Sequence, residues 1–299
     1  MSKPYELPLQ RDVLLDRTLL WIVVLGTLLM LATPAFAGLI FSTGNPDNRI
    51  GIASRPDSPA GIEIESADDF VLTKPTQIDS ATFTGVITGI SPIITQVVVE
   101  IYRVFPNDSD ALRPPNVTTR MNSPSDVELV GRDSAVAGEL SFTTTQLSAA
   151  FFVQNSILND INPKPNQQTG GEGSISGEEV QFNVTFTEPI DLLPDHYFFV
   201  PQVLTSDPSN QFFWLSAPKP STGGTGPFLP DLQSWVRNGN LDPDWSRVGT
   251  DIVGPPATGG PAPTFNAAFS LSGEVPEPTT LVLFGVGALA IWWLLRRKS

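Results

Sequence analysis

The single histidine is the first residue to consider for chemistry, because catalytic triads and imidazole metal sites both depend on a histidine with fixed partners. His196 is flanked by Asp195 and Tyr197 at the predicted start of a strand. The sequence shows no separate nucleophile or metal-ligand pattern that would complete a site around it. We therefore expect His196 to be a strand-end residue, not a catalytic one.

Paired carboxylates are the other catalytic candidates. Glycoside hydrolysis requires two of them facing each other across a cleft. The adjacent or near-adjacent acidic residues are Asp68 with Asp69, Glu178 with Glu179, and Asp242 with Asp244. Nothing in the sequence selects one pair for chemistry, and acidic pairs are common in solvated turns and strand edges. The sequence therefore predicts a protein that is not an enzyme.

A calcium loop is an alternative use for some of these oxygens. Asn238, Asn240, Asp242 and Asp244 place four oxygen side chains at alternate positions, which suits a hard cation such as Ca²⁺. A loop starting at Asn240, however, has Trp245 where the sharp glycine turn belongs, and Pro243 stiffens the segment. We expect no cofactor, with Ca²⁺ kept as the alternative to a plain turn.

Three tryptophans of the body could instead bind sugar. Flat aromatic side chains on a rigid sheet can stack on glycan rings, and Trp214, Trp235 and Trp245 are the candidates. Aromatic side chains in a sheet protein are more often part of the core. A carbohydrate-binding or adhesion module, with an extracellular polysaccharide as its partner, is therefore the alternative function.

Charge and cysteine content exclude several classes. Three of the 31 acidic and six of the 17 basic side chains lie in the terminal segments, which leaves 28 acidic and 11 basic side chains between Gly38 and Pro278. Nucleic acid is not an expected partner, because phosphate binding needs clustered cations. The absence of cysteine excludes disulfides, thiolate metal sites and cysteine nucleophiles.

Alternation of apolar and polar residues predicts an all-β body. The clearest examples are Val180–Thr187, Phe265–Leu271 and the more central strand Ile94–Val104. About ten short strands separated by proline and glycine favour an antiparallel β-sandwich or jelly-roll-like fold. The other predicted strands are Ile62–Ile64, Phe70–Thr73, Ile78–Thr84, Val127–Val130, Tyr197–Leu204 and Gln211–Leu215, and one or two helical turns are predicted within Thr145–Leu158.

The N-terminal segment is typical of a signal peptide. Arg17 precedes the apolar run Leu19–Leu31, which is too short to span a bilayer comfortably, and small residues follow at Ala35 and Ala37. The pattern predicts cleavage before Gly38, with an uncleaved anchor as the alternative.

The C-terminal segment is typical of a membrane span. Leu281–Leu295 contains no polar side chain and would reach about 22 Å as a helix, or about 27 Å if the helix begins at Pro278. Arg296, Arg297 and Lys298 follow at once, and the positive-inside rule places them in the cytoplasm. The body is then outside the membrane.

Val275-Pro276-Glu277-Pro278, the apolar stretch and the basic end together resemble the PEP-CTERM sorting signal of Gram-negative bacteria. The resemblance implies recognition of Pro276, Glu277 and Pro278 by exosortase, an integral membrane protease that removes the tail. It is consistent with the two prolines, which keep the segment extended and stop the helix from growing past Pro278.

The domain organisation follows from these segments. We expect a signal peptide over residues 1–37, a β-sandwich over 38–272, a tether over 273–278, a transmembrane helix over 279–295 and a basic tail over 296–299. The predicted function is that of an exported, non-enzymatic cell-surface or extracellular-matrix protein. Its precursor would be anchored in the inner membrane by a single span and then reach the envelope or matrix.

Overall fold

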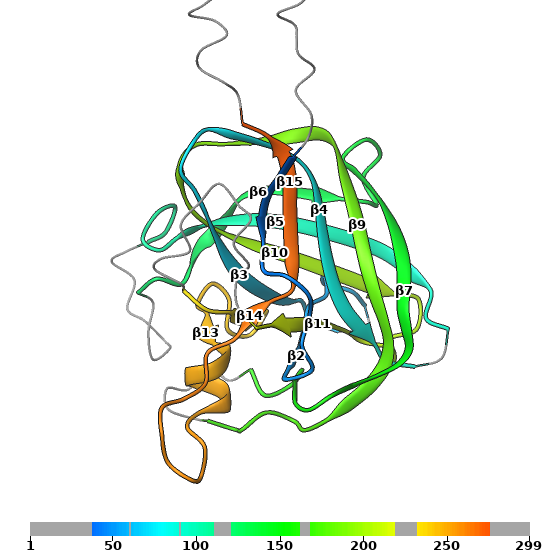
Figure 1. The fold of residues 1–299 in the computed structure, drawn as a ribbon, viewed down its shortest axis with the longest axis vertical. Coiled ribbons are helices and arrows are strands. Elements are labelled where there is room, and N and C mark those ends of the chain that lie inside the picture. Colours follow the sequence, from blue (N-terminus) through cyan, green and yellow to red (C-terminus); the bar gives the residue numbers. More distant parts are fainter. Residues whose placement is uncertain are drawn as a thin grey trace, which may run out of the picture. The chain divides into compact units, whose positions relative to one another are not determined.

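The computed structural model describes residues 38–59, 61–89, 91–110, 121–161, 168–218 and 232–275, all within one compact unit that begins at Ala37. Nearly all the regular structure in these residues is β-strand, which confirms the predicted all-β class (Figure 1). The one helical element in these described residues is a π-type turn, η1 (Val248–Val253). The strands are β1 (Gly38–Ser42), β2 (Gly51–Ala53), β3 (Ile64–Leu72), β4 (Thr76–Ile87), β5 (Ile94–Val104), β6 (Pro124–Asp133), β7 (Leu140–Val153), β8 (Ser156–Ile157), β9 (Ile175–Leu192), β10 (Asp195–Thr205), β11 (Phe212–Ala217), β12 (Trp235–Asn238), β13 (Ser246–Arg247), β14 (Asn266–Ala267) and β15 (Phe269–Glu274).

The larger sheet has nine strands and is organised around β4. On one side β4 pairs along its whole length with β9, which in turn pairs with β7. On the other side it pairs first with β15 and then, near its end, with β11. β1 lies outside β15. Beyond β11 the sheet continues with β2, which pairs antiparallel with β11, and then with β8. β2 and β8 form the one parallel pair in the described residues.

The smaller sheet has the order β13-β12-β3-β10-β5-β6, and all its described pairs are antiparallel. Its inner face packs on the larger sheet. Phe199 of β10 stacks on Phe269 of β15 at 5.0 Å between ring centroids and lies 6.3 Å from Phe83 of β4. One cluster of buried side chains thus draws from both sheets, which is the arrangement of a β-sandwich.

The outer face of the smaller sheet is covered as well. Phe198, Val200 and Tyr102 point outward from β10 and β5 and pack with Trp235 and Trp245, which belong to the segment around β12. The chain after residue 232 therefore forms a second, smaller core on this face. This coverage explains how β3 can be buried along almost its entire length.

Most of the predicted strands are confirmed, and β5 has the predicted bounds. The predicted helical turns within Thr145–Leu158 are wrong, because β7 extends to Val153 and β8 follows at Ser156. Leu147, Ala150, Phe151 and Ile157 have helical spacing, but the long ladder to β9 and the β-branched run Thr143–Thr145 favour the strand.

Candidate functional site

The two ends of the body lie side by side. β1 and β15 pair antiparallel, with Gly38 opposite Gly273 and Leu39 opposite Ser272. The first residue after the predicted signal peptide is therefore next to the last residues before the Pro-Glu-Pro segment. Figure 1 shows the start of β1 and the end of β15 next to each other at one end of the larger sheet.

This junction is firmly held by the sheet. β15 pairs with β4 up to Glu274, opposite Gln77, so the strand continues two residues beyond the predicted body end at residue 272. Thr43, just after β1, forms three hydrogen bonds with Phe269. Its backbone N–H and its hydroxyl donate to the Phe269 carbonyl at 3.0 and 3.1 Å, and its hydroxyl accepts from the Phe269 N–H at 2.8 Å. The tether therefore starts from a rigid strand.

Residues 274–298 match the family model of the PEP-CTERM protein-sorting motif. The chain is thus an exported protein of the kind that exosortase, a membrane protease, sorts, and the predicted resemblance is confirmed. The matched segment begins at the last residue of β15. No curated protein and no solved structure matches the chain.

The remaining predicted sorting residues lie outside the described part of the chain. These are Pro276, Glu277 and Pro278 of the motif, Ala35 and Ala37 of the signal, and Arg296, Arg297 and Lys298 of the basic end. In the residues that are described, no helix is long and apolar enough to cross a membrane. The predicted signal peptide and transmembrane helix therefore stay predictions.

His196 lies at the start of β10, as predicted, and has a carboxylate partner that the sequence did not indicate. Its Nε2 is 2.6 Å from Oδ2 of Asp69, on the neighbouring strand β3. The other oxygen of Asp69 accepts the backbone N–H of Leu232 at 3.1 Å. Asp69 thereby links His196 to the segment that begins at Leu232 and covers the outer face of the smaller sheet.

The predicted acidic pairs are separated by the fold. Asp68 is buried and accepts the Ser234 hydroxyl at 3.0 Å and the Ala267 N–H at 2.9 Å, so it ties β3 to two other segments. Glu179 is buried in β9, whereas Glu178 accepts the N–H of Ser91 at the surface. The contacts of Asp68 and Glu178 give these carboxylates a structural role.

Two of the four side chains considered for calcium, Asn238 and Asp242, are held by contacts within the protein. Oδ1 of Asn238 accepts the N–H groups of Asn240 and Leu241, both at 3.1 Å, which is an Asx-type turn. Asp242 forms an ion pair with Arg237 at 2.8 Å. The described residues contain no group of three or more acidic or histidine side chains arranged for a metal.

The three tryptophans do not form a sugar platform. Trp214, Trp235 and Trp245 are each at most 1% exposed. Trp214 belongs to the inter-sheet core, where its ring lies 5.7 Å from that of Phe269, and its indole N–H donates to the Ala268 carbonyl at 2.9 Å. All three are core residues, which removes the observation on which the carbohydrate alternative was based.

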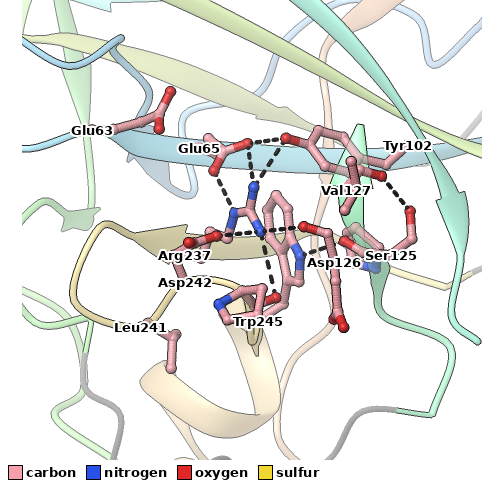
Figure 2. Close-up of polar contacts among 12 residues, drawn as sticks. Glu63, Glu65, Tyr102, Ser125, Asp126, Val127, Arg237, Leu241, Asp242 and Trp245 are labelled. Atoms are coloured by element: carbon pink, nitrogen blue, oxygen red, sulfur yellow. Dashed lines mark hydrogen bonds and ion pairs between the residues drawn. The ribbon is translucent and has the colours of Figure 1, made fainter. Parts of the chain in front are cut away.

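The most unusual polar group is a buried cluster centred on Arg237 of β12 (Figure 2). Its Nε and Nη2 bind the two carboxylate oxygens of Glu65, and Nη2 also donates to the Tyr102 hydroxyl at 3.0 Å. The guanidinium lies 4.4 Å from the centre of the Trp245 ring. The cluster links β12, β3 and β5, whose residues are far apart in the sequence.

A second carboxyl group, Glu100, adjoins this cluster. Burial first, and then the nearby charges of Glu65 and Glu63, raise the pKa of Glu100 to about 9. The Tyr102 hydroxyl lies 2.6 Å from Glu65 and 3.2 Å from Glu100. A phenol has one hydrogen, and the shorter of the two contacts directs it to Glu65.

The raised pKa of Glu100 predicts a pH-dependent stability. In the unfolded chain a glutamic acid loses its proton near pH 4.3, whereas the folded Glu100 keeps its proton up to about pH 9. Folding therefore binds a proton between these pH values, and the free energy of unfolding falls as the pH rises.

We expect Glu100→Gln, which is neutral at every pH, to reduce the loss of unfolding free energy between pH 5 and pH 8 by at least about 1.4 kcal/mol, the equivalent of one pKa unit. Urea unfolding of both chains at several pH values measures it. The matched control is Glu188→Gln, an exposed glutamate of β9, which should keep the wild-type slope. Equal slopes for Glu100→Gln and wild type would contradict a protonated Glu100.

Proposed function

We propose that this chain is a non-enzymatic cell-surface or extracellular-matrix protein. Its β-sandwich is displayed outside the inner membrane on a single-pass precursor, and exosortase then removes the tail and transfers the body to the envelope or matrix. The sorting motif supports the export and the processing. The position of the body relative to the membrane is inferred from the pairing of its first and last strands.

The observation that carries the proposal is the pairing of β1 with β15. Because Gly38 lies opposite Gly273, a leader and a tail that both enter the membrane can do so beside one end of the folded body. The body can therefore fold while either end is still held. Cleavage before Gly38 would leave β1 complete, since that strand begins at Gly38.

The non-enzymatic role is supported by how the candidate groups are used. Glu65 and Arg237 are 3% and 5% exposed and bind each other. His196 and Asp68 serve to hold the segment that covers the smaller sheet and the strands next to it. Each of these side chains therefore has contacts that give it a structural role.

A carbohydrate-binding or adhesion module is the second candidate, and one hollow still favours it. The hollow has a volume of about 400 Å³ and includes Arg55, Thr95, Thr205 and Phe212. Phe212 pairs with Ile87 at the opposite end of β4 from the junction, so the hollow would face away from the membrane. Arg55-dependent binding of acidic oligosaccharides would favour this candidate.

Labelling of intact cells tests the display. The chain has no cysteine, so Ile93→Cys, at a side chain 66% exposed, would be the single thiol. We expect a membrane-impermeant maleimide to label it on intact cells. The control, Ser299→Cys, should react in the unprocessed precursor only after lysis. Labelling of Ile93→Cys only after lysis would overturn the proposal.

A further inference from the structure

β7 is a long strand at the edge of the larger sheet. It contains 14 residues, and in the described part of the chain its strand partner is β9 alone. Figure 1 shows β7 as the outermost strand beside β9. One side of its backbone therefore presents N–H and C=O groups that no described strand pairs.

This edge lacks the usual protection. Natural edge strands carry charged residues, prolines or bulges that prevent pairing with another chain. From Leu140 to Gln154 the sequence has no charged residue and no proline. The outer strand of the smaller sheet, β6, begins with a proline and has four charged residues, whereas the ladders of both strands have two register irregularities. The contrast between β6 and β7 is therefore one of charge and proline content.

The usable part of β7 is its first half. Its pairing with β9 runs without interruption from Leu140 opposite Phe186 to Gln146 opposite Val180, and the register shifts only after that. Seven regular residues span roughly 24 Å of strand. Ser141, Thr143, Thr144, Thr145 and Gln146 are all exposed there.

We propose that two copies of this chain pair antiparallel through β7, which joins their larger sheets into one. The segment is complementary to itself. A two-fold axis at Thr144 places Thr143 opposite Thr145 of the partner subunit, and threonine pairs across strands are stabilising. An isologous contact of this kind is the commonest arrangement in soluble oligomers.

Charge favours a second copy over an unrelated partner. The body is strongly acidic, yet this edge is neutral over fifteen residues, so two such edges meet without like charges facing each other. A basic partner would find no carboxylate on β7 to bind. Because a two-fold contact uses the β7 edge of both copies, the association closes at a dimer and does not extend into a filament.

Introduced cysteines test the contact in the full chain in detergent. Facing residues of an antiparallel pair have Cα atoms about 4.5–5.5 Å apart, within the range of a disulfide. We expect Thr144→Cys to form a disulfide-linked dimer under mild oxidation. Thr185→Cys, an exposed residue on the neighbouring strand β9, should stay monomeric on the same gel. No crosslink at Thr143, Thr144 or Thr145 would overturn the proposal.

The oligomeric state gives a second readout that needs no crosslink. Light scattering should show a dimer for the wild type and a monomer for Thr143→Lys/Thr145→Lys. Thr185→Lys/Thr187→Lys adds the same charges to exposed positions of β9 and should remain dimeric. A monomeric wild type, or dissociation by the β9 variant and not by the β7 variant, would contradict pairing through β7.

Discussion

Replacing both Pro276 and Pro278 with alanine is expected to leave the C-terminal tail attached to the protein. Proline disfavours helix at and before its own position, whereas alanine is the best helix former. In Pro276→Ala/Pro278→Ala we expect the predicted transmembrane helix to extend through Glu277, so that the protease no longer meets an extended strand. The protein should then accumulate in the membrane fraction at precursor size.

A matched control separates this effect from proline loss in general. Pro255 and Pro256 lie in an exposed loop of the body, outside the matched motif of residues 274–298. Pro255→Ala/Pro256→Ala should be processed like the wild type. Normal processing of the Pro276→Ala/Pro278→Ala chain would show that exosortase recognises something other than the rigid Pro-Glu-Pro segment.

Replacing Arg237 with methionine is expected to lower the free energy of unfolding by about 3–5 kcal/mol. The substitution leaves Glu65 buried without its cationic partner and removes the contact with the Trp245 ring. Urea unfolding measures the loss. The double variant Arg237→Met/Glu65→Leu should recover much of it, because the pair is then replaced by apolar side chains.

An exposed ion pair provides the comparison for Arg237. Arg103 and Asp108 lie 3.3 Å apart with side chains 36% and 41% exposed. Arg103→Met should cost at most about 1 kcal/mol, since water screens such pairs. Equal losses for Arg103→Met and Arg237→Met would contradict a special role for the buried cluster.

The sequence predicted those parts of the fold where alternation is local and strong. Ile94–Val104 and Val180–Thr187 lie in strands β5 and β9. β7 was mistaken for helical turns because its apolar residues have mixed spacing and its conformation depends on the ladder to β9. Pairing with a distant strand decides the conformation of such a segment, and the local spacing of apolar residues does not reveal that pairing.

The same limit applies to the candidate sites. The sorting motif is contiguous, so the sequence alone identified it. Arg237 and Glu65 are 172 residues apart, and His196 and Asp69 are 127 apart. Only the fold brings these pairs together. The burial of Trp214, Trp235 and Trp245 likewise depends on which side of a sheet another segment covers.

Intact mass of the mature protein, isolated from cells with and without exosortase, tests the display and release of the body. With the protease, we predict a chain that begins at Gly38 and ends near the Pro-Glu-Pro segment. Without it, the chain should still carry residues up to Ser299. The same tail-bearing mass from both kinds of cell would contradict removal of the tail, and with it the release of the body from the membrane.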